Sequence, residues 1–274
     1  MGSEMCIRDS FTTNLDQLNQ QLFALTTNGG TELVARAIHT SLEELDWSGD
    51  DAVKIVFVAG NESAEQDTRY SLSQVTQAAK QNGVVVNTLF CGNADEQIAR
   101  GWMSTAQLGG GMYASIDQQA GAIAAIATPM DAKIVELNHE LNQTYVAYGK
   151  DGERHRQNQV KQDANAASMS APSATSRTVA KASGIYKNVE WDLVDAVENG
   201  TDLEELEAEA LPEPMREMSQ EQRREFVEVK AERRSVLKQQ IAQLGQDRRD
   251  YIAEEKAKQV GTSTVGLDLS LIHI

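Results

Sequence analysis

Cysteine is scarce in the 274-residue sequence, and long hydrophobic runs are absent from it. The two cysteines are Cys6 and Cys91, and Cys6 lies in a terminal run that is set aside below. The single remaining cysteine excludes an internal disulfide framework and a zinc ribbon, because both need several cysteines. No apolar run approaches the length of a membrane-spanning helix, so we predict no membrane span in this sequence.

The sequence also contains few basic residues relative to acidic ones. The chain has 25 Lys and Arg residues against 41 Asp and Glu residues, which gives a formal net charge of −16. A nucleic-acid-binding surface needs clustered basic residues, so this balance argues against a nucleic acid as partner. The acidic excess is concentrated in residues 11–149, where 6 bases stand against 16 acids, 6 − 16 = −10.

The two ends of the sequence are unlike the rest. Back-translation of residues 1–10 ends in the reverse complement of the back-translation of residues 269–274, which is typical of a sequencing adapter read at both edges. We therefore expect both runs to be adapter artefacts that should be left out of fold reasoning. The protein itself would then be residues 11–268, 274 − 10 − 6 = 258 residues, from the interior of a longer gene.

Residues 11–149 contain the strand-like runs of the chain. Residues 53–59 and 84–91 are near-continuous apolar runs that suit buried strands, and residues 112–115 form a weaker one. A helix-like spacing over residues 70–80 predicts a βαβ crossover and a parallel sheet. We predict an α/β fold with an incomplete Rossmann-like parallel sheet, without its first strands, in a three-layer arrangement. The flanking helices are expected at residues 15–25, 31–45, 95–106 and 117–127.

Residues 150–268 are predicted to form an all-α extension. The last and longest helix, residues 219–258, begins with a capping-box pattern at Ser219 and Gln222. A seam at a 3–4 spacing predicts a coiled-coil-like arm and a candidate surface for oligomerisation. Its members are Phe226, Val229, Arg233, Leu237, Ile241, Leu244, Arg248 and Tyr251. The acidic run at residues 202–209 is predicted to be a solvated helix face. Other helices are expected at residues 131–148, 154–182 and 191–197.

Thr31 is the first candidate site residue. It follows Gly29 and Gly30 and precedes a predicted helix. One interpretation is structural: the two glycines allow a turn, and the Thr31 hydroxyl caps the helix. The other is functional: the hydroxyl binds a hard divalent cation at the helix N-terminus. The spacing alone favours the cap.

Asn61 and Glu62 are the second candidate. They follow the strand predicted at residues 53–59, and ligands of open parallel sheets bind outside the carboxyl ends of the strands. Both side chains offer oxygen donors for a cation. The structural alternative is a simple turn with Glu62 facing water. Cys91, at the end of an apolar strand, is interpreted as a small buried hydrophobe. The sequence shows no catalytic constellation, so we predict that the chain is not an enzyme.

Six runs of the sequence follow a known family pattern: residues 22–32, 55–62, 84–92, 142–149, 163–168 and 191–197. In these runs the sequence resembles the later part of a bacterial von Willebrand factor type A (VWA) domain followed by a helical extension. The resemblance covers nearly all of residues 11–268 and assigns residues 11–149 to a partial VWA domain and residues 150–268 to the extension.

The resemblance implies a metal-ion-dependent adhesion site that binds Mg²⁺ or another divalent cation. Of its three elements, an Asp-x-Ser-x-Ser loop is missing from this sequence, and a lone Thr corresponds to Thr31. An Asp of the third element is replaced, so Asn61 or Glu62 would have to substitute. We therefore expect the metal in the intact parent protein and little or no binding by this chain.

The resemblance also implies a function. It predicts a non-enzymatic, adhesion-type module that binds a protein partner and whose parent is exported from the cytoplasm. One alternative is an assembly or maturation factor that works with an AAA-type ATPase. Another is a structural helical-arm protein with a degenerate VWA domain.

Overall fold

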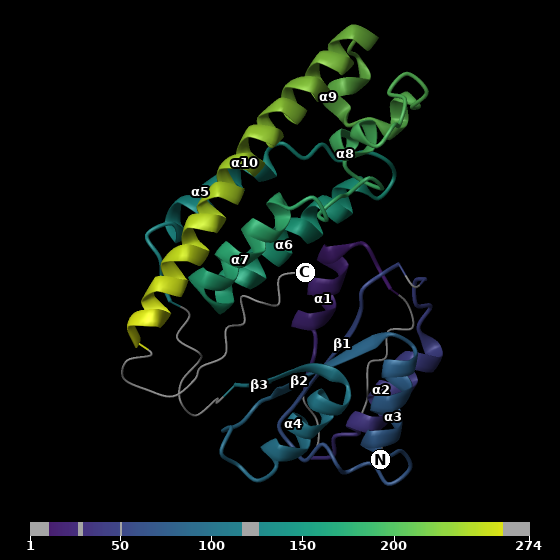
Figure 1. Cartoon of the computed structure of the whole chain (residues 1–274). Coiled ribbons are helices and arrows are strands. Elements are labelled where there is room, and N and C mark those ends of the chain that lie inside the picture. The colour runs from purple at the N-terminus through teal and green to yellow at the C-terminus, as the bar shows by residue number, and fades with distance from the viewer. Residues whose placement is uncertain (1–10, 27–29, 50, 117–125, 260–274) are drawn as a thin grey trace. The chain divides into compact units, whose positions relative to one another are not determined.

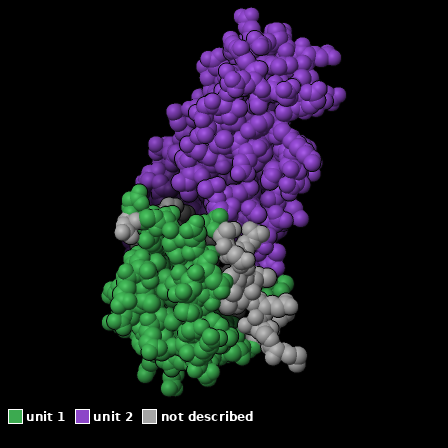
Figure 2. All heavy atoms as spheres, turned by 90° about the vertical axis from the view of Figure 1, so that its right-hand side faces the viewer, with its two compact units in different colours: residues 1–11, 26–125, 266–274 green, residues 12–25, 126–265 purple. Residues whose placement is uncertain are grey.

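The computed structural model describes residues 11–26, 30–49, 51–116 and 126–259. The chain divides into two compact units, shown in Figure 2. We name them the sheet unit (residues 1–11, 26–125 and 266–274) and the helical unit (residues 12–25 and 126–265). The terminal runs expected to be adapter, residues 1–10 and 269–274, lie outside the described residues.

The division between the units differs from the one predicted at Gly149. Residues 12–25 and 126–149 were expected to belong with the strands, but both segments are part of the helical unit. The reason lies in packing. Helix α1 (Leu15–Phe23) packs against α6 (Gly152–Met169), and α5 (Asp131–Asn142) packs against the last helix of the chain.

The sheet unit is built on three strands, β1 (Lys54–Gly60), β2 (Val84–Phe90) and β3 (Gly110–Ser115). They form a parallel sheet in the order β1-β2-β3, as Figure 1 shows. β1 pairs with β2 in continuous register, whereas the β2–β3 pair has a register shift between Val86 and Thr88. The predicted parallel α/β sheet is confirmed.

One face of this sheet is covered by α2 (Val34–Glu44), α3 (Leu72–Gln81) and α4 (Ala99–Leu108). Their apolar side chains form one core with those of β2 and with Val56 and Val58 of β1. Because side chains alternate along a strand, Phe57 lies on the other face. The core therefore lies between the sheet and a single layer of helices.

The predicted three-layer arrangement is not present in the described part of the sheet unit, which has two layers. Of the two helices that were expected to complete the unit, residues 15–25 correspond to α1 of the helical unit. The other, predicted at residues 117–127, falls mainly on residues outside the described ranges.

Helix α1 buries its charged residue and leaves two of its three leucines exposed, whereas Leu15 packs on the core of the helical unit. Asp16 is 2% exposed, whereas Leu18 and Leu22 are exposed. Asp16 accepts hydrogen bonds from Arg177 Nη2 and from the Tyr186 hydroxyl, both at 2.6 Å. These two bonds fix which side of the helix faces the unit, so the leucine spacing could not predict its orientation.

The helical unit contains α1 and a series of helices that follow residue 126. Helix α5 buries Ile134, Leu137 and Leu141, as predicted, and ends before Tyr145, which is buried in the same core. The predicted helical stretch at residues 154–182 is divided at Ser170, close to the Ser-rich segment around Pro172, and Ser170 caps the N-terminus of the second helix, α7 (Ala171–Ala182). The other elements are α6, α7 (Ala171–Ala182), α8 (Leu193–Glu198), a 3₁₀ turn (Ala208–Ala210), α9 (Glu213–Arg216) and α10 (Gln220–Gln259).

The long helix α10 begins with the predicted capping box. The Ser219 backbone N–H donates to Gln222 Oε1 at 2.8 Å, and the Gln222 N–H donates to Ser219 Oγ at 3.2 Å. The face of α10 that packs on α5, α7 and α8 contains Leu237 and Ile241, which are fully buried in the helical unit. The predicted seam is thus occupied by helices of the same chain.

Two details of the predicted helical extension are wrong. Val229 was placed in the seam but is exposed, and Val227 is buried instead. The acidic run at residues 202–209 is a loop ending in a 3₁₀ turn instead of a helix, because Leu203 and Leu211 pack into an apolar core. Across the described residues, no helix is both long enough and apolar enough to span a membrane.

Candidate functional site

The carboxyl end of β1 is the place where two of the predicted site segments meet. The segment before α2 contributes Glu32, whose Oε1 accepts a hydrogen bond from the backbone N–H of Asn61 at 2.9 Å. The Glu32 N–H in turn donates to Gln66 Oε1 at 2.8 Å. These contacts join residues that lie about 30 positions apart in the sequence, and they bring the neighbourhood of Thr31 to the edge of the sheet.

Gly60, the last residue of β1, makes this contact possible. A Cβ atom at residue 60 would lie 1.9 Å from Oε2 of Glu32, so the carboxylate rests directly against the glycine. Oε2 is buried and has no hydrogen-bond partner among the described residues. A buried carboxylate oxygen is normally satisfied, so this one is a candidate ligand atom for a water or a cation.

The loop that follows β1 is held by polar contacts on both sides. Arg36 of α2 pairs with Asp67, whose Oδ1 also accepts the Arg69 N–H at 2.8 Å. Burial alone would raise the pKa of Asp67, but these hydrogen bonds and the Arg36 charge hold it below its usual value. From α4, the indole N–H of Trp102 donates to the Glu62 carbonyl at 2.8 Å. The edge of the sheet is therefore fixed in place.

Thr31 does not cap α2. The helix begins at Val34, its N-cap residue is Leu33, and no side chain caps it. Thr31 lies outside the helix and is exposed. The structural interpretation that the sequence favoured is therefore wrong at this position, because the helix starts later than its apolar spacing suggested.

The predicted metal ligands fit a hard cation only in part. Thr31, Asn61, Glu62 and the free oxygen of Glu32 are oxygen donors of the kind that Mg²⁺ prefers, but Mg²⁺ needs about six ligands in close geometry. Within the described ranges, no group of three or more His, Cys, Asp or Glu side chains is placed to hold a metal ion. The donors at this edge do not make up a complete Mg²⁺ site.

Cys91 lies at the same edge, directly after β2. Its N–H donates to the Gly60 carbonyl at 2.6 Å, and its side chain is half-buried. Burial and the negative charge of Glu32 raise the pKa of the Cys91 thiol. The thiol is therefore protonated at neutral pH, which suits a packed residue and argues against a nucleophile.

An open pocket of about 360 Å³ lies between the loop after β1 and helix α4. Its lining contains the side chains of Tyr70, Ser71, Ser73 and Ser104 and the carboxylates of Glu65 and Asp67. Asp67 is already paired with Arg36. The described lining residues include three serines and no histidine, cysteine or lysine.

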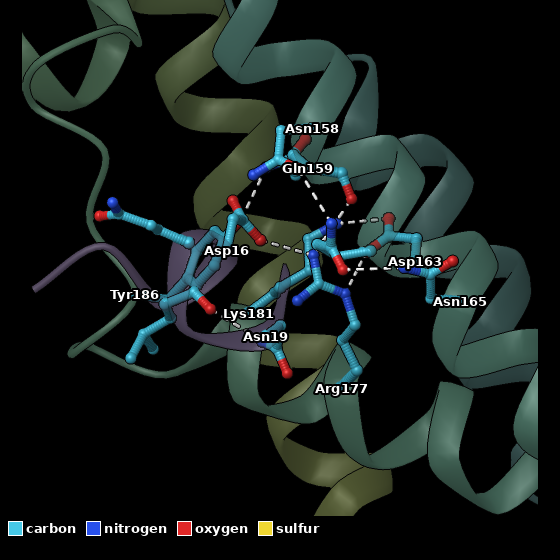
Figure 3. A network of polar contacts seen from close by, with 12 residues as sticks. Asp16, Asn19, Asn158, Gln159, Asp163, Asn165, Arg177, Lys181 and Tyr186 are labelled. Carbon is cyan, nitrogen blue, oxygen red and sulfur yellow. Dashed lines mark hydrogen bonds and ion pairs between the residues drawn. The ribbon is translucent and has the colours of Figure 1, made fainter. Parts of the chain in front are cut away.

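The helical unit contains a buried network of charged residues, shown in Figure 3, which we name the Asp163 network. Two carboxylates, Asp16 and Asp163, face two cations, Arg177 and Lys181. Lys181 Nζ donates to Asp163 Oδ2 at 2.8 Å and to the side-chain carbonyl oxygens of two asparagines. The charges of the four residues cancel, and all three ammonium protons are used.

A second buried network, the Arg234 network, joins α10 to the start of α8. The five N–H groups of Arg234 donate to Asp192, Asp195 and Thr144, with the shortest distance at 2.5 Å. The guanidinium also lies 4.3 Å above the ring of Tyr145. A fully satisfied arginine of this kind is typical of a structural network and leaves no donor for a ligand.

These networks account for the runs at residues 142–149, 163–168 and 191–197 that the sequence singled out. Thr144 and Asp192 are buried, and the side chain of Asp163 is 13% exposed. Both networks are internally paired, so we interpret them as structural features of the helical unit. The residues that sequence reasoning missed are Glu32, Asp16 and Arg234, whose roles depend on contacts between distant parts of the chain.

A comparison with protein-family models, curated proteins and solved structures finds no match to this chain. The resemblance to VWA domains therefore depends on the sequence runs alone.

Proposed function

We propose that the chain is a non-enzymatic, protein-binding module of the VWA type, with the carboxyl edge of the parallel sheet as its partner-binding surface. The observation that supports this most is the contact between Glu32 and Asn61, which brings two predicted site segments to one edge. Ligands of open parallel sheets bind at this edge.

The metal dependence is proposed for the intact parent protein. Thr31, Asn61 and Glu62 would supply some of the oxygen ligands there, and the rest would come from a loop that this sequence does not contain. The bound cation would accept a carboxylate of the partner. An exported location of the parent is proposed on the resemblance alone.

A calorimetric titration of the chain with MgCl₂ tests the incomplete metal site. We expect no saturable heat in the micromolar range, because too few ligands are present to offset the dehydration of Mg²⁺. The Glu62→Gln variant should behave in the same way. Micromolar binding that Glu62→Gln abolishes would contradict the proposal that the site is incomplete in this chain.

Oligomerisation through residues 219–258 is part of the same proposal. Since Leu237 and Ile241 are buried in the helical unit, such an interface would have to use the exposed side of α10, where Val229 and Val236 lie. Replacing both valines with Lys should then lower the sedimentation coefficient of any assembly. An unchanged sedimentation coefficient would show that this side of α10 is not an interface.

A further inference from the structure

The pocket of about 360 Å³ between the loop after β1 and helix α4, which we name the α4 pocket, has walls that hydrogen bonds hold in place. The indole N–H of Trp102 ties α4 to this loop, and Asp67 ties the same loop to Arg36 of α2. Within α4, the Thr105 hydroxyl donates to the Gly101 carbonyl at 2.7 Å. Small-molecule sites are usually preformed cavities of about 300–1,000 Å³, so the α4 pocket suits a small ligand.

The charges that line the α4 pocket select against an anion. Its described lining contains the carboxylates of Glu65 and Asp67 and no lysine, arginine or histidine. The charge of Asp67 is neutralised by Arg36, whereas Glu65 is exposed and forms no ion pair with any described residue. The lining therefore has a net negative charge, which repels an anionic ligand and attracts a cationic one.

The rest of the lining combines apolar surface with hydroxyl groups. Ala64, Leu72 and Leu108 contribute the apolar surface. The hydroxyl oxygens of Ser71 and Ser73 lie 2.8 Å apart and share one hydrogen bond, so both can still accept another. An ammonium group has three N–H donors and no acceptor, so hydroxyl and carboxylate oxygens complement it.

Gly101 of α4 leaves room for the Glu65 side chain at the wall of the pocket. A Cβ atom at residue 101 would lie 3.8 Å from Cγ of Glu65 and 3.7 Å from Cβ of Ala64, which is ordinary van der Waals contact. Glu65 therefore lies along this turn of α4. Ser104, which also lines the pocket, follows three residues later on the same face of the helix and adds a further hydroxyl.

We propose that the α4 pocket binds a small aliphatic amine. The ammonium group pairs with Glu65 and donates to the serine hydroxyls, and the alkyl chain packs on Leu72 and Leu108. Because Glu65 is exposed, solvent screens this ion pair, and the binding is expected in the millimolar range. The site uses none of the predicted metal ligands and does not depend on the function proposed for the carboxyl edge of β1.

An amide NMR titration of the full chain with n-butylammonium chloride, at constant ionic strength, tests the proposal. We expect saturable shifts at the amides of Glu65, Ser71, Ser73 and Ser104, and none with 1-butanol, which has the same alkyl chain without the charge. Glu65→Gln should weaken the binding about three- to five-fold, as expected for the loss of an exposed ion pair. The matched control is Glu205→Gln, in the exposed acidic loop, which should bind like the unmodified chain.

Glu65 is exposed, so Glu65→Gln should leave the amide spectrum away from the pocket unchanged, which shows that the variant is folded. Four results would each overturn the proposal: no saturable shift at millimolar amine, shifts centred on residues 202–209, equal binding of 1-butanol, or unchanged binding by Glu65→Gln.

Discussion

Oε1 of Glu32 accepts a hydrogen bond from the Asn61 backbone N–H at 2.9 Å, while Oε2 of the same carboxylate lies against Gly60 without a partner. The Glu32 side chain thus fixes the edge of the sheet through one carboxylate oxygen and places the other there, buried and without a hydrogen-bond partner. This relationship makes the carboxyl end of β1 the candidate site.

Gly60→Ala should destabilise the sheet unit. The added Cβ would lie 1.9 Å from Glu32 Oε2, so the carboxylate must move and lose its bond to Asn61. We expect a loss of about 1 kcal/mol of unfolding free energy, measured by urea denaturation, because the atoms that move are the flexible end of the Glu32 side chain and the cost is mainly one lost hydrogen bond. The double variant Gly60→Ala, Glu32→Ala removes the clash and should recover part of that loss. If the double variant recovers none of the lost unfolding free energy, contact with Glu32 is not what destabilises Gly60→Ala.

Arg234→Met should strongly destabilise the helical unit. The substitution leaves Asp192 and Asp195 buried without their cation, and removing one partner of a buried ion pair costs about 3–5 kcal/mol. Arg233→Ala is the matched control, because the Arg233 side chain, which pairs with Glu140, is 54% exposed. An exposed pair contributes at most about 1 kcal/mol. Equal losses in urea denaturation would contradict the structural role of Arg234.

The acid stability of the helical unit should depend on Asp163. Burial alone would raise its pKa, but the charges of Lys181 and Arg177 outweigh burial and hold the pKa below its usual value. A lowered carboxyl pKa stabilises the folded state above the unfolded pKa of about 3.9, and that stabilisation is lost as the pH falls through the folded pKa.

Urea denaturation at several pH values between neutral and strongly acidic measures this dependence. The unmodified chain should lose unfolding free energy below about pH 4. Asp163→Asn should be less stable at neutral pH and show a shallower decline in acid. If the unfolding free energies of the two proteins fell in parallel with pH, the lowered pKa of Asp163 would make no contribution to acid stability.

The strands and most helices could be predicted from the sequence because their signals are local. The apolar runs before Gly60 and Phe90 fix β1 and β2, and the pair of Ser219 and Gln222 fixes the start of α10. The predicted metal ligands Thr31, Asn61 and Glu62 lie in the two segments that the contact between Glu32 and Asn61 brings together.

The remaining features depend on contacts between distant residues. Asp16 and Arg177 are 161 positions apart, and their ion pair turns α1 so that Leu18 and Leu22 are exposed. Arg234 and Thr144 are 90 positions apart. A periodic pattern identifies a helix and its apolar side, but it cannot show that a buried ion pair will determine its orientation.

The measurement that tests the account most directly is Mn²⁺ line broadening in amide NMR spectra of the full chain. As Mn²⁺ is added, the amide signals of Thr31, Glu32, Asn61 and Glu62 should broaden first, because the unpartnered carboxylate oxygen of Glu32 lies there. The binding should be weak, and an excess of Mg²⁺ should reverse the broadening. Glu62→Gln should reduce it, and Glu205→Gln, in the exposed acidic loop, should not. Broadening that begins at residues 202–209 and spares the carboxyl end of β1 would contradict the assignment of this edge as the site.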